Sequence, residues 1–227
     1  MKVFAFSDPH FPWVNMKKLK AVYGAIKVEK PDVVINLGDL YDLYMFSRFS
    51  KDLDIIKPRQ ELCRSRRKAE EMWSYIKEIA PDAQLLQMAG NHDARCLNLI
   101  KHNAPQLLST MREAQIKYFT FKGVKTYYSE RDYVEFDGVV YCHGWYAPGC
   151  TAHKRHFKKP VVHGHTHKPD MEWEPARKSD YKPLWEMDTG TLADPNAAPF
   201  NYTSSRMSGW KAAYGVITDG NPRLFIV

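Results

Sequence analysis

The sequence predicts an α/β fold, and three observations support this prediction. Short apolar runs with the length of buried strands alternate with longer stretches whose apolar residues recur at helical spacing. Beyond Lys117 the pattern changes to successive strand-like runs. Several of the runs end in Asp, Asn or His beside a glycine. Because α/β sheets carry their chemistry outside the carboxyl ends of the strands, we expect a functional site at that edge.

The composition is that of an ordinary globular protein with an excess of basic residues. The 227 residues contain no internal repeat and no low-complexity tract, so we expect a single domain spanning residues 1–227. Lys and Arg number 33 against 26 Asp and Glu, which gives a net charge of +7 and a pI near 9.1. This excess favours polyanionic partners such as nucleic acid, and a solvated basic surface without a partner is the alternative.

Membrane association and secretion are not expected. No apolar stretch is long enough to cross a bilayer, and the first predicted strand leads into Asp8 without a signal peptide. The cysteines form no C-x-x-C pair, which favours reduced thiols in a cytoplasm. Cys142 precedes His143 in a predicted strand, where neighbouring side chains face opposite ways. We therefore expect Cys142 in the core rather than as a nucleophile.

The first strand, Lys2 to Phe6, ends at Asp8 and His10. These two residues are two positions apart, so in extended backbone their side chains would face the same way, and a carboxylate with an imidazole suits a divalent transition metal. Asn15 is expected to cap a helix that runs to about Lys30.

A second buried strand, Asp32 to Leu37, is followed by Gly38 and Asp39. The glycine permits a tight turn, which would deliver Asp39 to the same edge as Asp8 and His10.

A third strand, Leu85 to Ala89, breaks at Gly90 and presents Asn91 and His92. Before it, a helix is expected from about Arg59 to Ile79. The aromatic stretch between Leu43 and Pro58 is interpreted either as a lid beside the site or as packing against that helix.

Helical spacing continues from Leu97 to Met111 with a break near Pro105, and strand-like runs then follow. We predict them at Lys117–Tyr128, Asp132–Phe136 and Val139–His143, with a hairpin turn at Asp137-Gly138. His143 again stands at a strand end.

A short helix from Thr151 to Lys159 carries several bases and no acid, and it is the strongest candidate anion patch. Another apolar strand then leads to His165 and His167, which repeat the spacing of Asp8 and His10. The last strands are expected within Leu184–Leu192 and Ala212–Val227, and the irregular loop between Ala193 and Gly209 could border the site.

Carboxylate, imidazole and amide groups thus end separate strands throughout the chain. They are Asp8, His10, Asp39, Asn91, His143, His165 and His167. They exceed the four ligands of one closed zinc site and would serve two open metal sites. The motifs that contain these residues resemble those of the calcineurin-like metallophosphoesterase family, over residues 8 to 167. In chain order they are Asp-x-His, Gly-Asp-x-x-Asp, Gly-Asn-His-Asp, His-Gly and Gly-His-x-His.

The resemblance implies a four-layer α-β-β-α fold, a two-sheet β-sandwich flanked by helices, with a dinuclear metal centre. Asp8, His10 and His167 would hold one ion, and Asn91, His143 and His165 the other. Asp39 would bridge the ions, which lie about 3.5–4 Å apart in such pairs, and a hydroxide bridging them would attack phosphorus. His92 would stabilise or protonate the leaving oxygen, with Asp42 holding its imidazole, and Asp93 would support the site.

The resemblance implies two divalent ions. Mixed oxygen and nitrogen ligands do not determine which metal is bound. We expect manganese, with iron, zinc or nickel as alternatives. Arg95, Lys154 and Arg155 are candidates for contacts with a substrate phosphate, because cationic side chains pair with phosphate oxygens. No obligate protein partner is evident.

Small bacterial and phage phosphoesterases are the branch that the motifs resemble. The arginine and glutamate motifs typical of the family's protein phosphatases are absent here, where Leu43, Tyr44 and Asp93 stand instead. We therefore expect a phosphodiesterase, nuclease or phosphatase that acts on nucleic acid or nucleotides, in the cytoplasm of a bacterial or phage-infected cell. The alternatives are a protein phosphatase and a catalytically silent protein-binding scaffold, which the retained His92 disfavours. A simple nucleic-acid-binding module would leave the ligand set unexplained.

Overall fold

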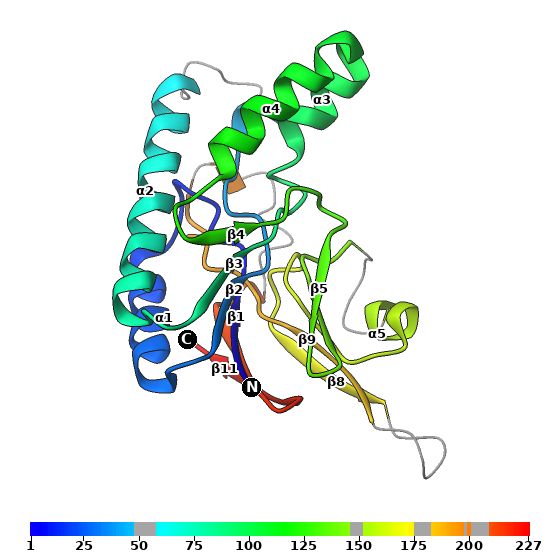
Figure 1. Cartoon of the computed structure of the whole chain (residues 1–227). Helices are drawn as coiled ribbons and strands as arrows, with labels where there is room; N and C mark the ends of the chain where they lie inside the picture. Colours follow the sequence, from blue (N-terminus) through cyan, green and yellow to red (C-terminus); the bar gives the residue numbers. More distant parts are fainter. Residues whose placement is uncertain (48–57, 146–151, 175–182, 198, 201–208) are drawn as a thin grey trace.

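Two mixed β-sheets, stacked face to face, form the centre of this computed structural model (Figure 1). The structure describes all residues except 48–57, 146–151, 175–182, 198 and 201–208. The first sheet has the order β11-β10-β1-β2-β3-β4, in which β1 to β4 are parallel and β10 and β11 antiparallel. Its strands are β1 (Lys2–Phe6), β2 (Val33–Asn36), β3 (Gln84–Gln87), β4 (Val124–Thr126), β10 (Ala213–Thr218) and β11 (Asn221–Ile226).

The second sheet has the order β5-β6-β7-β9-β8, with β6, β7 and β9 parallel and the two edge strands antiparallel. Its strands are β5 (Tyr133–Phe136), β6 (Val139–Cys142), β7 (Val161–His163), β8 (Asp170–Glu174) and β9 (Leu184–Asp188). The predicted hairpin turn is confirmed at Asp137-Gly138, where both residues have positive φ, as a tight two-residue turn requires.

Helices cover the outer faces of both sheets (Figure 1). Helices α1 (Met16–Glu29) and α2 (Pro58–Ile79) lie on the first sheet, and α5 (Ala152–Phe157) lies on the second. Asn15 caps α1, since its side chain accepts the backbone N–H groups of Lys17 and Lys18. The predicted two-sheet architecture flanked by helices is therefore confirmed.

Alternation along β1 shows how one strand serves two cores. Val3 and Ala5 face the second sheet, whereas Phe4 and Phe6 face the helices, because successive side chains of a strand point to opposite faces. The shared core between the sheets includes Ile35 from the first sheet and Val162 from the second. This continuity supports one domain over residues 1–227, which stays a prediction.

Two elements differ from the sequence-based expectations. The region Lys117–Tyr128 is not one strand, because α4 (Leu108–Phe119) continues into it and only β4 is extended. Tyr118 and Phe119 look like strand formers, but they pack on Tyr41 from the helix, at ring-centroid distances of 4.7 and 4.9 Å. Strand β8 was not expected, because its alternating acids interrupt the apolar pattern of a buried strand. It lies at the edge of its sheet, where charged side chains are common.

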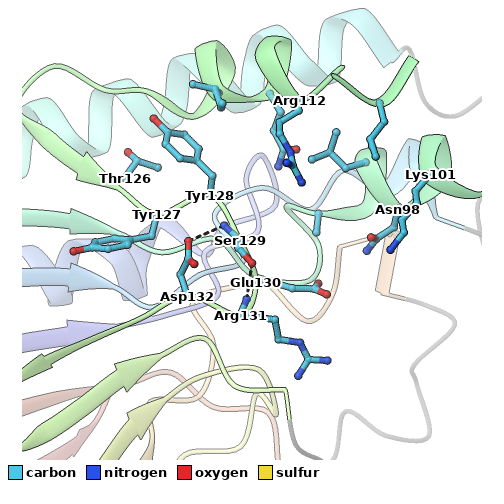
Figure 2. Close-up of a pocket in the computed structure, with 15 residues that line it drawn as sticks. Asn98, Lys101, Arg112, Thr126, Tyr127, Tyr128, Ser129, Glu130, Arg131 and Asp132 are labelled. Carbon is cyan, nitrogen blue, oxygen red and sulfur yellow. Dashed lines mark hydrogen bonds between the residues drawn. The ribbon is translucent and has the colours of Figure 1, made fainter. Parts of the chain in front are cut away.

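The helix pair α3 (Arg95–Asn103) and α4 is joined by a 3₁₀ turn, Pro105–Leu107, which confirms the break near Pro105. A hollow of about 650 Å³ lies between these helices and the segment that joins β4 to β5 (Figure 2). Lys101, Arg112 and Arg131 line it. Most of the aromatic stretch after Leu43 and much of the loop between 193 and 209 lie outside the described residues. No helix in the described part of the chain is both long and apolar enough to span a membrane.

Candidate metal centre

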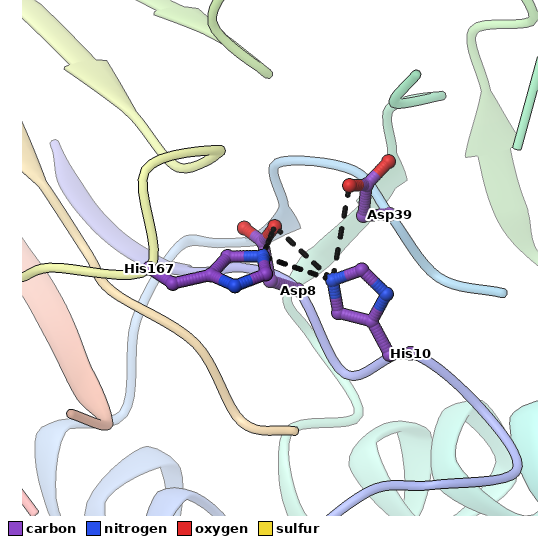
Figure 3. Close-up of side chains that lie close together, drawn as sticks. All are labelled: Asp8, His10, Asp39 and His167. Carbon is purple, nitrogen blue, oxygen red and sulfur yellow. Dashed lines mark hydrogen bonds and ion pairs between the residues drawn. The ribbon is translucent and has the colours of Figure 1, made fainter. Parts of the chain in front are cut away.

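The predicted ligands form two adjoining sets at the carboxyl ends of the parallel strands. In the first set, ligand atoms of Asp8, His10, Asp39 and His167 all lie within 4.8 Å of one another (Figure 3). His167 Nε2 lies 3.0 Å from Asp8 Oδ1 and 3.1 Å from His10 Nε2. His10 Nε2 lies 3.8 Å from Asp39 Oδ2. All four side chains are buried.

The second set consists of Asn91, His143 and His165. The Asn91 Oδ1 atom lies 2.9 Å from His143 Nε2 and 2.8 Å from His165 Nδ1. His143 Nε2 lies 3.4 Å from Asp39 Oδ1. Asp39 thus stands between the sets, with Oδ2 toward His10 and Oδ1 toward His143. All the predicted metal ligands are therefore brought together in these two sets.

The donor atoms fit divalent cations. Ligand atoms about 2.0–2.2 Å from one ion, at tetrahedral or octahedral angles, lie roughly 3.0–3.5 Å from each other. The spacings of 3.0 and 3.1 Å in the first set match this range. His10 and His167 point ring nitrogens at each other, an arrangement that needs a proton or cation between them. Carboxylate, amide and imidazole donors suit borderline transition metals.

The backbone brings these side chains together in a way that the sequence spacing did not reveal. Asp8, His10, Asp39, His165 and His167 all have positive φ, between 48° and 76°. Such residues are uncommon outside glycine and cluster at functional sites. The extended-backbone argument for Asp8 and His10 was wrong, because β1 ends at Phe6 and a turn makes the two side chains converge. His165 and His167, which repeat that spacing, also have positive φ and lie in different sets, as the family resemblance implied.

Two glycines allow the loops to approach the carboxylates closely. A Cβ added at Gly90 would collide with Asp39, and one at Gly164 would collide with Asp8. Side chains at either position would displace a ligand, which explains why glycine precedes both Asn91 and His165.

The electrostatics of the sets favour bound cations. Burial opposes ionisation of Asp8, but hydrogen bonds from His10 and His167 outweigh it and hold the pKa of Asp8 well below its usual range. Burial likewise opposes ionisation of Asp39, yet nearby His143 and His92 keep its pKa low. Burial lowers the pKa of His10, but hydrogen bonds to Asp42 and Asp8 overcome this and raise it to about 10. The buried carboxylates therefore attract positive charge to the place between the ligands.

His92 lies beside the first set and is held by two neighbours. Its Nδ1 atom lies 2.9 Å from Asp42 Oδ1. An N–H of Arg95 donates to His92 Nε2 at 2.8 Å, so the imidazole proton lies on Nδ1 and donates to Asp42. Burial, together with the charge of Arg95, lowers the pKa of His92 to about 4. A second N–H of Arg95 donates to the Asp42 carbonyl at 2.8 Å.

Asp93 supports the loops rather than facing the ligand sets. Its carboxylate accepts the backbone N–H groups of Leu40, Tyr41 and Gly90, at 2.8 to 3.1 Å. It therefore ties the Asp39 loop to the Asn91 loop. Asp42 has a similar second contact, 3.2 Å from His10 Nδ1, which orients that ring.

The predicted phosphate contacts behave differently from one another. Lys154 is 1% exposed and its Nζ lies 3.7 Å from Glu172, so it is directed at an acid in this structure, and its contact with a substrate phosphate stays a prediction. Acids from β8 and β9, which are distant in sequence, contact this basic helix. Arg155 is exposed and lies 3.6 Å from Glu174, and its phosphate contact stays a prediction, as does that of Arg95.

Sequence reasoning missed a buried group behind the second set, formed by His153, His163 and Glu186. The signal that could have revealed it is Glu186 itself, an acid within the otherwise apolar start of the strand Leu-Trp-Glu-Met. A buried carboxylate in such a strand needs partners.

The hollow between α3 and α4 is linked to the loop of the metal centre through two of its lining residues. Ala94 lines it and directly follows Asn91, His92 and Asp93 in the chain. Gln115, also in its lining, donates a hydrogen bond to the Asp93 carbonyl at 3.1 Å. Within the described part of the chain, Lys101 and Arg112 form no ion pair.

The two-sheet fold and this ligand set define a class of proteins that binds divalent metal ions at the edge shared by two sheets. The family model for calcineurin-like phosphoesterases matches residues 1–181, and the chain belongs to that family. This membership implies divalent metal ions as cofactors, in agreement with the buried cluster of histidines and aspartates.

Two curated relatives are phage proteins. The Gene 54 protein of Mycobacterium phage D29 is 27% identical, with 97% of this chain and 90% of the relative covered. The Gene 54 protein of Mycobacterium phage L5 is 26% identical, with 96% and 88% covered. Among solved structures, Yfce, a phosphoesterase from E. coli, is 15% identical with a TM-score of 0.46, covering 96% of this chain and 88% of that one.

Proposed function

We propose that this protein is a dinuclear metal-dependent phosphoesterase. The observation that carries the proposal is the position of Asp39, which directs one carboxylate oxygen toward each of two ligand sets. A single metal site would not need that arrangement. Two ions held in this way would clamp the entering and leaving oxygens of a phosphoryl group and activate a water as the nucleophile.

The residues have separate roles in this proposal. Asp8, His10 and His167 would hold one ion, Asn91, His143 and His165 would hold the other, and Asp39 would serve both. His92 stabilises or protonates the leaving oxygen, since it lies beside the ligands with Nε2 3.9 Å from Asp39 Oδ2. Protonation requires Nε2 to release the Arg95 N–H that it accepts in this structure and to take up a proton itself. Asp42 fixes the tautomer and orientation of His92 through the 2.9 Å hydrogen bond.

We propose manganese as the activating ion and nucleic acid or a nucleotide as the substrate. Mixed oxygen and nitrogen donors suit manganese, with iron, zinc or nickel as alternatives. The net charge of +7 and the cations along the hollow, Lys101, Arg112 and Arg131, support a polyanionic substrate. The phage origin of the two relatives supports action inside an infected bacterial cell.

The proposed function is tested by assaying a monoester, a linear diester and a 2′,3′-cyclic phosphate side by side with manganese. We expect hydrolysis of at least one, with loss of activity in excess chelator and recovery when manganese is added back. If the protein binds two ions and hydrolyses none of these substrates, the phosphoesterase proposal is wrong and the scaffold alternative gains support.

Arg112→Ala is expected to raise the KM for a single-stranded oligonucleotide by roughly two- to fivefold, because an exposed ionic contact contributes up to about 1 kcal/mol. The KM for bis(p-nitrophenyl) phosphate, which is too small to extend along the hollow, should not change. Arg67→Ala is the matched control, since Arg67 is an exposed arginine on α2 outside the hollow. Equal effects of both variants would show that the hollow does not bind the substrate.

A further inference from the structure

Glu186 lies at the centre of a buried hydrogen-bond network behind the second ligand set. Its Oε1 atom lies 2.8 Å from His153 Nδ1 and 3.1 Å from His163 Nε2. Its Oε2 atom accepts the backbone N–H of Lys154 at 3.0 Å. Glu186, His153 and His163 are all at most 1% exposed, so the network is shielded from water.

Two imidazoles and a carboxylate in contact resemble a metal site, but the proton positions indicate otherwise. The backbone N–H of Trp145 donates to His153 Nε2 at 3.0 Å, and a backbone N–H can only donate. His153 therefore accepts at Nε2 and carries its proton on Nδ1, which points at Glu186. That proton occupies the position of a cation. The three side chains thus form a hydrogen-bond network rather than a third metal site.

The charge state of the network follows from its contacts. Burial would raise the pKa of Glu186, but hydrogen bonds from His153 and His163 outweigh burial and keep the pKa below its usual value. His163 Nδ1 lies 2.8 Å from the Gly164 carbonyl, which can only accept, so Nδ1 also carries a proton. Because His163 Nε2 also faces the ionised Glu186, at 3.1 Å, His163 carries both ring protons as an imidazolium, and the carboxylate accepts a ring N–H from each side.

Both imidazoles connect Glu186 to the loops that carry the second set. His153 holds the N–H of Trp145, two residues beyond His143. His163 holds the carbonyl of Gly164, the residue directly before His165. The N–H of Gly164 donates in turn to the His143 carbonyl at 2.9 Å, which joins the two loops.

We propose that Glu186 is a positioning residue for the second metal ion, acting through His153 and His163 on the loops of His143 and His165. The inference rests on the proposed dinuclear function and adds to it a residue that contacts neither ion. Groups that orient metal ligands from behind typically change metal affinity by about 10- to 100-fold when they are replaced. Among the described residues, Glu186 contacts no member of the first set, so the effect should be selective.

Glu186→Gln tests this proposal at nearly constant side-chain volume. An amide offers one acceptor atom, so its NH₂ group must face either the Lys154 N–H or a ring N–H, donor against donor. We expect the Kd of the second manganese ion to rise by about 10- to 100-fold, while the first ion binds as in the wild type. Isothermal titration and metal analysis after gel filtration give both values without an activity assay.

Glu135→Gln is the matched control, because Glu135 lies on the edge strand β5 of the same sheet, its side chain is 38% exposed and it pairs with the exposed Lys159. Its metal binding should equal that of the wild type. His153→Phe is the second variant and keeps a ring while it removes the link to Trp145. We expect this variant also to weaken the binding of the second ion alone. It tests the role of the network if Glu186→Gln does not fold.

The inference is wrong if both Glu186→Gln and His153→Phe bind two ions with wild-type affinities. It is also wrong if the folded variants lose both ions to the same extent, because that indicates a general structural role. Failure of the proposed function would be seen in the wild type instead of the variants, because the wild type would then not bind two ions. The two failures are therefore distinguishable in one titration series.

Discussion

His92→Ala is expected to lower kcat by roughly 10²- to 10⁴-fold while both metal ions stay bound, because a positioned acid or base typically contributes that factor. His92 is held by Asp42 and Arg95, and its Nε2 atom lies 3.9 Å from Asp39 Oδ2, so its removal leaves both ligand sets intact. The measurement is kcat with manganese, together with metal analysis of the same sample.

The choice of substrate separates a role in leaving-group protonation from a role in binding. A poor leaving group such as a nucleoside hydroxyl needs a proton more than nitrophenolate does, so the loss should be larger for a dinucleotide than for bis(p-nitrophenyl) phosphate. His102→Ala, at an exposed histidine on α3, is the control and should retain full activity. If His92→Ala hydrolysed the dinucleotide at the wild-type rate, the proposed role would be excluded.

The ligand identities could be predicted from the sequence because each one follows a recognisable strand. Apolar runs before Asp8, Asp39, Asn91, His143 and His165 predict buried strands, and parallel strands end at a common edge. Side-chain chemistry then limits what such an edge can do. Neither step requires the backbone angles, and for this reason the predicted ligands lie together although the extended-backbone argument for Asp8 and His10 was wrong.

What the sequence could not give are contacts between distant segments. The sequence of helix α5 alone suggests a basic surface, but Lys154 is buried. Glu172 from β8 lies beside its ammonium group, and Glu186 from β9 accepts its backbone N–H. Similarly, Tyr118 and Phe119 suggest a strand until Tyr41 packs against them on a helix. In both cases tertiary packing overrides a local pattern, as it commonly does for short segments.

Asp39→Ala is expected to remove both metal ions and to reduce kcat/KM by at least about 10³-fold. The two-metal clamp supplies several kcal/mol of transition-state stabilisation, and about 4 kcal/mol corresponds to that factor. Asp39 lies between the ligand sets, so it is the one predicted ligand whose loss weakens both. Metal analysis and titration with manganese measure the first effect, and steady-state kinetics the second. Asp82→Asn, at an exposed acid, is the control for general loss of charge.

Asp39→Asn then tests how Asp39 serves the two ions. The N–H of His92 donates to Asp39 Oδ1 at 2.8 Å, so an asparagine should keep its oxygen at that position, on the side of His143. Its NH₂ group would then face His10, where a metal ligand needs a lone pair. We therefore expect this variant to lose the ion of Asp8, His10 and His167 more readily than the ion of Asn91, His143 and His165. Equal loss of both would show instead that a single oxygen of Asp39 bridges the ions, because that oxygen would then govern both sites together.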